Sequence, residues 1–318
     1  MRRFVLFMSL LAILVAGADF ALTKLFDALY VRVRTGQTGG EINQYLAMPQ
    51  TPAMLIMGNS RARYQVDPDS FVVPTYSLCH AGMGQVFQTG LLDVLRLHKK
   101  LPPAILLHVD FEEYMDADNT EDVGNLRYYY HKVPSITSEI NGISKYERVK
   151  YLFQFYRYNG RTINTLKNYL QSINYSYAGN GYQKSPPVLG DTATFRMPAP
   201  SPVNPRVHRA NLRHLESFIK RCKSNQVKLL CFTSPYLSPH SYAATAARSI
   251  DSLLRTQHVP YLNVAAHTPP ILMHHAKLWQ DGDHLNELGA TCLSHELAQW
   301  SAPFLRANAS APLATGSH

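Results

Sequence analysis

The sequence predicts a three-layer α/β/α fold built on a mostly parallel sheet of five strands. Short apolar runs with the character of buried strands alternate with amphipathic helical stretches along much of the chain. This alternation is typical of parallel sheets that are covered by helices on both faces. The first run, Ala53–Met57, breaks at a glycine and leads to Ser60 at its carboxyl end, where open α/β sheets place their ligands.

Length and composition agree with a globular protein. The chain has 318 residues, of which 46% are hydrophobic and 17% charged, enough for one large domain or two modest ones. The net charge of +9 and the pI near 9.3 would suit an anionic partner. The lysines and arginines are scattered, however, and no recognition helix, zinc finger or RNP-type motif is present in the sequence. Nucleic acid is therefore not an expected partner.

Residues 1–29 predict a membrane signal anchor or a signal peptide. Two arginines precede an apolar run from Phe4 to Ala18, which is the pattern of an export signal. The end of this run fits a small-x-small cleavage site, whereas apolar character resumes at Phe20 and favours an uncleaved anchor. Both alternatives place residues 30–318 outside the cytoplasm. We expect a single-pass protein of the inner (plasma) membrane with a periplasmic domain, or a secreted protein if the signal is cleaved.

After a polar approach segment at 30–52, the first half of the α/β domain spans residues 53–111. Its predicted strands are Ala53–Met57, Thr75–Leu78 and Ala104–Val109. A predicted helix, Gln85–His98, carries its apolar residues on one face at helical spacing.

Residues 112–203 interrupt the strand–helix rhythm and predict an insertion that covers one end of the sheet. The segment has helical stretches at 122–132 and 144–172, followed by a loop rich in glycine and proline from Gly179 to Pro205. It holds most of the chain's 19 tyrosines. These could form a carbohydrate platform, because aromatic faces stack on sugar rings, or could pack an ordinary helical subdomain. The sequence leaves both alternatives open.

The second half of the α/β domain spans residues 204–304, and a disordered tail is expected at 305–318. A helix capped by Asn204 and reaching Ser224 is followed by further elements in the same rhythm. Asn286 can cap the last helix. The other predicted elements are a strand at Val227–Phe232, a helix at Tyr242–Arg255 and a strand at Val259–Val264.

Ser60, Asp281 and His284 are the candidate catalytic residues. A serine hydroxyl is a poor nucleophile until an adjacent base takes its proton, and that base needs a third group to fix its tautomer. Asp281-x-x-His284 offers both from one loop, with the carboxylate able to turn back onto the imidazole. The α/β-hydrolase elbow Gly-x-Ser-x-Gly is not met, because Ala62 occupies the last position.

This combination resembles the SGNH (GDSL-like) hydrolase superfamily, which implies a flavodoxin-like α/β/α fold. Gly58-Asn59-Ser60 resembles the family's first block, with asparagine in place of aspartate. Gly82 fits the glycine of the second block, whose N–H is an oxyanion donor in the family. Asp281 and His284 fit the last block. The resemblance covers roughly residues 53–110 and 204–300.

The third block of this family is not matched. The family has Gly-x-Asn-Asp there, and its asparagine is a further oxyanion donor, whereas the corresponding strand end here reads His108-Val109-Asp110-Phe111. One missing donor typically costs about 10²–10³ in rate. Asn59 and Arg61, on either side of the serine, are the candidates for additional oxyanion or substrate contacts.

The resemblance is greatest to a bacterial exported branch that transfers acyl groups on surface polysaccharides. The Gly-x-Ser-Arg-Ala block, the N-terminal anchor and Gly39–Asn43 carry it. It implies an O-acyl, in particular acetyl, transferase or esterase that acts on a cell-surface carbohydrate beside a membrane-bound O-acyltransferase partner. The alternatives are an inactive glycan-binding or assembly subunit and, with less support, a lipolytic esterase at the membrane.

No cofactor and no metal are expected for this chemistry. His274 and His275 with the acidic loop at 281–284 could be interpreted as a metal cluster, but adjacent histidines are rarely both ligands. The four cysteines have no CxxC spacing, and free cysteines are the favoured interpretation. They are Cys79, Cys222, Cys231 and Cys292.

Overall fold

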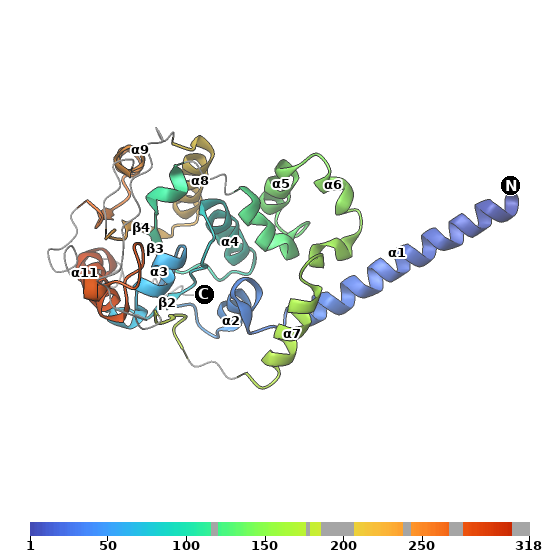
Figure 1. Cartoon of the computed structure of the whole chain (residues 1–318), viewed down its shortest axis with the longest axis horizontal. Helices are drawn as coiled ribbons and strands as arrows, with labels where there is room; N and C mark the ends of the chain where they lie inside the picture. Colours follow the sequence, from blue (N-terminus) through green and yellow to red (C-terminus); the bar gives the residue numbers. More distant parts are fainter. Residues whose placement is uncertain (116–119, 176–178, 186–206, 238–242, 267–275, 307–318) are drawn as a thin grey trace, which may run out of the picture. The chain divides into compact units, whose positions relative to one another are not determined.

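A computed structural model describes residues 1–115, 120–175, 179–185, 207–237, 243–266 and 276–306. Residues 307–318 of the predicted tail and most of the Gly179–Pro205 loop lie outside these residues, as do His274 and His275, whereas Leu305 and Arg306, predicted in the tail, end the last helix. Figure 1 shows the elements along the chain. The strands are β1 (Met54–Met57), β2 (Thr75–Ser77), β3 (Ala104–His108), β4 (Lys228–Thr233) and β5 (Tyr261–Asn263).

The helices include one very long apolar helix and a set of shorter ones. The α-helices are α1 (Arg2–Tyr30), α2 (Glu41–Ala47), α3 (Ser60–Gln65), α4 (Gln85–Leu97), α5 (Pro134–Ile143), α6 (Glu147–Lys150), α7 (Thr162–Ser172), α8 (Arg209–Ser224), α9 (Ala243–Thr256) and α11 (Glu287–Arg306). A π-helical turn, η1 (Gly36–Gly40), precedes α2. The 3₁₀ turns are η2 (Pro68–Ser70), η3 (Phe111–Tyr114), η4 (Thr120–Tyr129), η5 (Gln154–Tyr158) and η7 (Ala276–Leu278).

The chain forms two compact units, each made from several segments. The helical unit comprises Met1–Pro49, Asp93–Lys99 and Thr120–Tyr177, and the α/β unit comprises Gln50–Leu92, Lys100–Asn119 and Ala178–His318. The approach segment therefore belongs with the tyrosine-rich region. Residues just after that region return to the α/β unit, where the Ser77 N–H donates to the Asn180 carbonyl at 2.7 Å.

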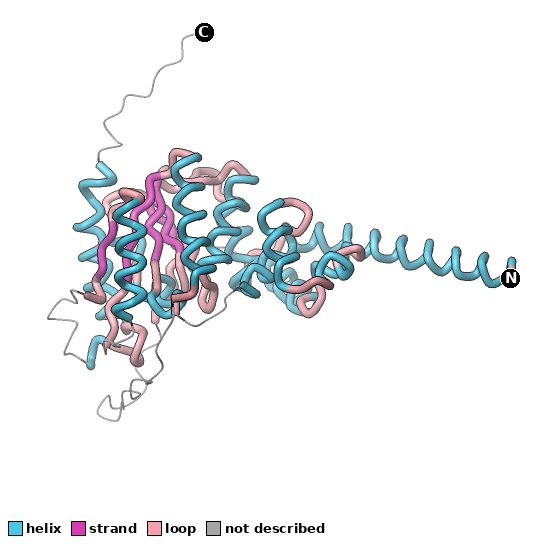
Figure 2. The backbone as a smooth tube through the Cα atoms, turned by 90° about the horizontal axis from the view of Figure 1, so that it is seen from above, coloured by secondary structure: helices cyan, strands magenta, loops and turns pink. Residues whose placement is uncertain are grey.

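The α/β unit confirms the predicted fold class. Its five strands pair in the order β2-β1-β3-β4-β5, and every pairing is parallel. Helices flank the sheet on both sides (Figure 2). Each strand lies within two residues of its predicted bounds. Because β2 and β3 lie on opposite sides of β1, the order reverses at β1 and β3, and their carboxyl ends form the switch point where such sheets bind ligands.

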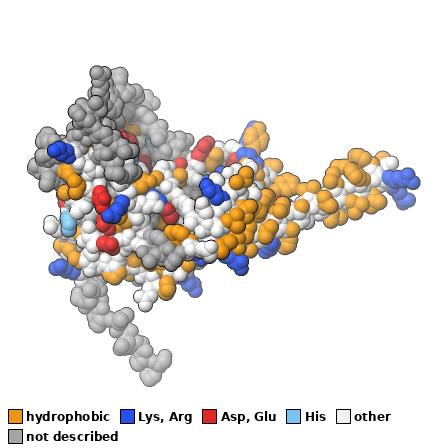
Figure 3. Space-filling model, turned by 60° about the horizontal axis from the view of Figure 1, so that its bottom comes forward, with side chains coloured by type: hydrophobic (Ala, Val, Ile, Leu, Met, Phe, Trp, Pro, Cys, Tyr) orange, Lys and Arg blue, Asp and Glu red, His pale blue; other side chains and the backbone are white. Residues whose placement is uncertain are grey.

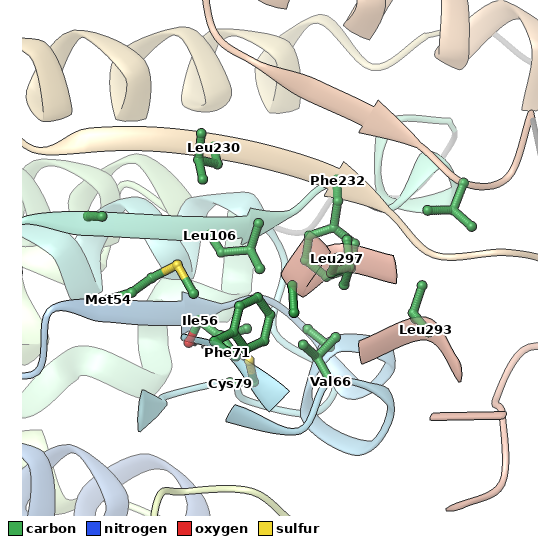
Figure 4. Close-up of a cluster of buried hydrophobic side chains, with 14 of the residues drawn as sticks. Met54, Ile56, Val66, Phe71, Cys79, Leu106, Leu230, Phe232, Leu293 and Leu297 are labelled. Carbon is green, nitrogen blue, oxygen red and sulfur yellow. Dashed lines mark hydrogen bonds between the residues drawn. The ribbon is translucent and has the colours of Figure 1, made fainter. Parts of the chain in front are cut away.

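Both faces of the central strands are buried, which explains why they are almost continuously apolar. Met54 and Ile56 point to the face covered by α3 and α11, where Leu106, Leu230 and Phe232 join the cluster drawn in Figure 4. Leu293 and Leu297 of α11 close this layer over the sheet. Asn286 caps α11 as predicted, because its Oδ1 accepts from the N–H groups of Leu288 and Gly289.

Two helix predictions differ from the structure. The helix expected to begin at Asn204 begins at Arg209, and residues 204–206 lie outside the described part. The stretch 144–172 is divided into α6, η5 and α7, because Phe153 adopts an extended backbone before η5 and Gly160 adopts a positive φ of 70° before α7. Both breaks allow neighbouring tyrosines to turn inward.

The tyrosines of the helical unit form an aromatic core. Tyr129, Tyr130, Tyr151 and Tyr158 are buried, and Tyr130 stacks on Tyr151 with ring centroids 3.7 Å apart. Tyr30 of α1 stacks on Tyr128 in the same way at 3.9 Å. Of the two alternatives left by the sequence, the structure favours packing for these residues, since their faces are occupied by one another.

Helix α1 combines an exposed apolar part with a packed carboxyl end. Among the described helices it is the one long and apolar enough to cross a membrane, with a mean hydropathy of 2.3 over 18 residues and none of that window buried. Towards its end Phe26 packs on Phe155 and Tyr158 of η5. Asp27 accepts hydrogen bonds from Tyr158 and Arg157 there. The structure thus agrees with a signal sequence or an anchor in residues 1–29.

Candidate active site

Ser60 lies at the first position of α3, just past the carboxyl end of β1. The turn requires Gly58, whose φ is 152° and whose Cβ, if present, would lie 2.6 Å from the Cβ of His108. Asn59 caps α3, because its side-chain Oδ1 accepts from the Arg61 N–H at 3.0 Å. A glycine for the tight approach and an asparagine for the cap therefore place the serine at the switch point of the sheet.

The structure brings the three predicted catalytic side chains together. The Oγ of Ser60 lies 3.0 Å from Nε2 of His284, within hydrogen-bonding reach. Nδ1 of His284 lies 3.0 Å from both carboxylate oxygens of Asp281. In this geometry Nδ1–H donates to the carboxylate and leaves Nε2 as the acceptor for the serine proton. The arrangement has the geometry of a nucleophile, a base and an orienting acid.

One turn holds both the acid and the base. Oδ1 of Asp281 accepts from the N–H groups of Asp283 and His284 at 2.9 and 2.8 Å, so the carboxylate caps its own turn. Gln65 of α3 donates to the Asp283 carbonyl at 2.9 Å and ties this turn to the helix that carries Ser60. Partial burial raises the pKa of Asp281, but the two N–H donors and His284 outweigh it, so the pKa lies below its usual value.

Two backbone N–H groups remain candidates for an oxyanion hole. Ser60 occupies the first turn of α3, where an N–H has no partner within the helix. Gly82 lies in the turn after β2 with a φ of 70°, a conformation that favours glycine. A Cβ at Gly82 would meet no atom within 4 Å, so the space beside this turn is open. The role of Gly82 as a donor stays a prediction.

Arg61 is buried in a polar network instead of facing open space. Its guanidinium donates to Asp110 at 3.2 Å and to the carbonyls of Ser234 and Pro235 at 3.0 and 2.5 Å. Its Cζ lies 3.8 Å above the centre of the Tyr236 ring, and the Tyr236 hydroxyl donates to Asp110 at 2.6 Å. The ion pair is nearly inaccessible, with side-chain exposures of 4% and 5%.

The electrostatics of this network keep Asp110 ionised. Burial raises the pKa of the Asp110 carboxyl, but Arg61, His108 and the hydrogen bonds from Tyr236 and Asn59 hold it well below its usual range. A buried carboxylate of this kind stabilises the fold only while its partners remain in place.

The amide of Asn59 is part of the same network. Its Nδ2 donates to Asp110 at 2.9 Å and to Glu113 at 2.8 Å, which uses both of its N–H bonds. In this arrangement the Asn59 amide and the terminal guanidinium nitrogens of Arg61 are engaged within the network, whereas Nε of Arg61 has no hydrogen-bond partner. These contacts hold Asn59 and Arg61 beside Ser60, and their predicted oxyanion or substrate contacts stay a prediction.

His108 lies beneath the nucleophile turn as a neutral, buried histidine. Its Nε2 accepts from the Ser234 N–H at 3.3 Å, and its Nδ1 has no hydrogen-bond partner. Burial, with the positive charge of Arg61 and despite the opposing effect of Asp110, lowers the pKa of His108 to about 3. The ring therefore stays uncharged at neutral pH and serves as an acceptor.

The buried His108 should make the α/β unit sensitive to mild acid. The pKa is lower in the folded than in the unfolded chain, so the unfolded chain binds more protons between about pH 6.5 and pH 3, and stability falls as pH falls. The side chain of His108→Gln does not titrate. Its free energy of unfolding should therefore fall by about 2 kcal/mol less than that of the wild type between pH 7 and pH 4.5.

Denaturant unfolding followed by tryptophan fluorescence measures this effect in the α/β unit alone, because Trp279 and Trp300 both lie in that unit. His258→Gln, two residues after α9, is the same substitution at another histidine of this unit and serves as the matched control. Equal acid sensitivity of the wild type and His108→Gln would contradict the assignment of a neutral His108.

Metal ligation finds no support in the described part of the chain. Within those residues no group of three or more His, Cys, Asp or Glu side chains is placed to hold a metal ion. The four cysteines are free, three of them buried and Cys292 partly exposed. The histidines of the alternative metal interpretation, His274 and His275, lie outside the described residues.

Sequence reasoning did not identify Asp110, Glu113 and Tyr236 as parts of the site. Asp110 follows β3 as Ser60 follows β1, so its position at the carboxyl end of the neighbouring strand was a usable signal. Tyr236 gives the same signal, since it follows β4, the neighbour of β3, although it lies 126 positions from Asp110.

Comparisons with known proteins leave the family open. No protein-family model matches the chain, and no curated protein matches its sequence. A solved structure from Bacteroides fragilis NCTC 9343, described as a "putative acylhydrolase", is similar with a TM-score of 0.42 and 11% sequence identity. The match covers 83% of this chain and 95% of that one. A similarity at this level assigns neither a family nor an activity.

Proposed function

We propose that this protein is a serine-dependent esterase or O-acyltransferase. The observation that carries the proposal is the geometry of Ser60, His284 and Asp281, in which each contact lies at 3.0 Å. Ser60 and the distant turn that holds His284 and Asp281 meet in the order that nucleophilic catalysis needs. Nothing in the packing of the fold alone requires this order.

The chemistry follows from the positions of the protons. Nε2 of His284 takes the Ser60 proton as Oγ attacks the acyl carbonyl, and Asp281 stabilises the resulting imidazolium. The oxyanion is held by the N–H groups of Ser60 and Gly82. His284 returns its proton to the leaving oxygen, and an acyl-serine remains. Water or a sugar hydroxyl, deprotonated by the same imidazole, then releases the acyl group and restores the serine.

The proposal also covers the class of substrate and the cellular compartment of the α/β unit. The Gly58–Ala62 block supports transfer or removal of an acetyl group on a cell-surface carbohydrate, beside a membrane-bound O-acyltransferase, through its resemblance to exported SGNH-like proteins. Helix α1 supports a membrane anchor with an extracytoplasmic α/β unit, because its apolar residues are exposed and follow two arginines.

A second candidate function is a non-catalytic glycan-binding or assembly subunit. It is favoured by one observation, that β3 is followed by Asp110, whose carboxylate engages Asn59 and Arg61 instead of offering a third oxyanion donor. A lipolytic esterase is a third possibility of the same chemistry, and a preference for long-chain over acetyl esters would single it out.

Labelling with a fluorophosphonate tests the proposed nucleophile without knowledge of the substrate. The wild type should become covalently modified at Ser60, located by mass spectrometry of the labelled peptide. His284→Ala should label far more slowly, since the serine then has no base. Ser70→Ala, a serine of η2 in the same unit, should label like the wild type. An unlabelled wild type would contradict the proposal and favour the binding subunit.

A further inference from the structure

The helical unit carries a second set of exposed apolar side chains, in α6 and in the residues between α6 and η5, of which Leu152 and Phe153 lie beside α1. Leu152 is 76% exposed, Phe153 53%, and Val149 and Tyr146 are each 61% exposed. The surfaces of soluble proteins rarely carry several large apolar side chains close together. Figure 3 shows apolar side chains along α1 and on the helical unit next to it, with basic side chains at the amino-terminal tip of the helix.

Hydrogen bonds fix the level of this surface along α1. The carboxylate of Asp19 accepts from the N–H groups of Gln154 and Phe155, each at 2.9 Å. Residues 152–154 therefore lie at the same height along the helix as Asp19. They also line, with the face of α1 from Met8 to Phe20, an apolar groove of about 590 Å³.

The length of the helix then places this level inside a bilayer. Fifteen residues separate Phe4 from Asp19, about 22 Å along an α-helix. The hydrocarbon core of a bilayer is about 30 Å thick. If the core begins at Phe4, after the two arginines, residue 19 is still within it, and tilting the helix brings residue 19 deeper. Counting from Met1 instead gives about 27 Å, which leaves the conclusion unchanged.

We infer that residues 146–153 form a second membrane contact, which inserts Val149, Leu152 and Phe153 into the outer leaflet and leaves the groove beside α1 to a lipid acyl chain. This inference rests on the proposed membrane anchor. The two N–H groups that would be costly in hydrocarbon are already satisfied by Asp19.

The flanking residues suit the headgroup level. Tyr146 is exposed next to this apolar segment, and aromatic side chains with a polar tip favour the membrane interface. Lys145, Arg148 and Lys150 surround it, against the single acid Glu147, so the segment has a basic balance. Anionic lipid headgroups attract a segment of this charge.

Helix α7 offers a matched reference outside the hydrocarbon core. Leu170 is 57% exposed, the same residue type as Leu152. Its helix is tied to the chain beyond the end of α1, since the Arg34 N–H donates to Ser172 and the Thr35 hydroxyl to the Asn168 carbonyl. Tyr30, the last residue of α1, lies about 16 Å further along the helix than Asp19, outside the hydrocarbon core.

Spin labels on the full-length protein in phosphatidylethanolamine–phosphatidylglycerol vesicles test the inference. Leu11→Cys, Leu152→Cys and Leu170→Cys are labelled in a Cys292→Ala background, and relaxation by oxygen is compared with relaxation by a water-soluble nickel chelate. We expect labels at 11 and 152 to respond several-fold more to oxygen, and the label at 170 to respond more to nickel.

The other outcomes separate the inference from the anchor. A label at 11 in lipid with a label at 152 in water would overturn the second contact and leave the anchor standing. A label at 152 shielded from both reagents would mean that protein, such as a second copy of this chain, covers the surface, and would also overturn it. A label at 11 in water would refute the anchor and the inference together.

Discussion

Ser60→Ala is expected to reduce turnover of a chromogenic acetyl ester by about 10⁴-fold or more, because the attacking oxygen is removed while the rest of the site remains. The substitution should leave stability within about 0.5 kcal/mol of the wild type, since Asn59 and not Ser60 caps α3. Initial rates over a range of ester concentrations measure the loss in kcat/KM.

Single and double variants of Ser60 and His284 test whether the two residues act together in one catalytic step. His284→Ala should cost about as much as Ser60→Ala, and the double variant should cost no more than either alone, because the two groups act in one step. Ser70→Ala is the control with the same chemical change outside the site. A Ser60→Ala variant that retains a tenth of the wild-type turnover would remove Ser60 as the nucleophile.

Asp110→Leu is expected to destabilise the α/β unit by about 3–5 kcal/mol, since it leaves the buried guanidinium of Arg61 without its carboxylate. Arg61→Met should cost a similar amount for the reciprocal reason. The double variant should be less destabilised than the sum of the two, with a coupling of about 1–3 kcal/mol. Denaturant unfolding followed by tryptophan fluorescence reports on this unit.

An exposed ion pair provides the control for this cycle. Asp251 pairs with Arg255 on α9, where the side chains are 45% and 77% exposed. Asp251→Asn should change stability by less than about 1 kcal/mol. Additive effects of Asp110→Leu and Arg61→Met would show that the two buried charges do not stabilise one another, contrary to the geometry.

The strands were predictable because their local sequence is sufficient. Runs such as Met54–Met57 and Ala104–Leu107 are apolar throughout, which leaves few alternatives to a buried parallel strand. The pairing of Ser60 with Asp281 and His284 came from the order of motifs in a resembled family. Physical reasoning from sequence alone could not have joined positions 224 residues apart.

The buried network around Asp110 and the aromatic core of the helical unit could not be predicted from the sequence, because their residues come from separate segments of the chain. Arg61, Asp110 and Tyr236 come from three segments, and no periodicity links them. The tyrosine-rich region was recognisable by composition, yet whether Tyr130 faces Tyr151 or a ligand depends on breaks in the helices, such as that at Gly160, which local propensity does not locate.

The turn that carries Asp281 and His284 has a consequence for how activity arises during folding. Ser60 belongs to the first strand–helix segment of the α/β unit, while its base and acid belong to the last turn before α11. Contacts between such distant positions form late, because a long loop must close first. A chain still in synthesis or transit would therefore hold an inert hydroxyl. Reactivity would appear only when the carboxyl-terminal turn, with both its acid and its base, docks on α3.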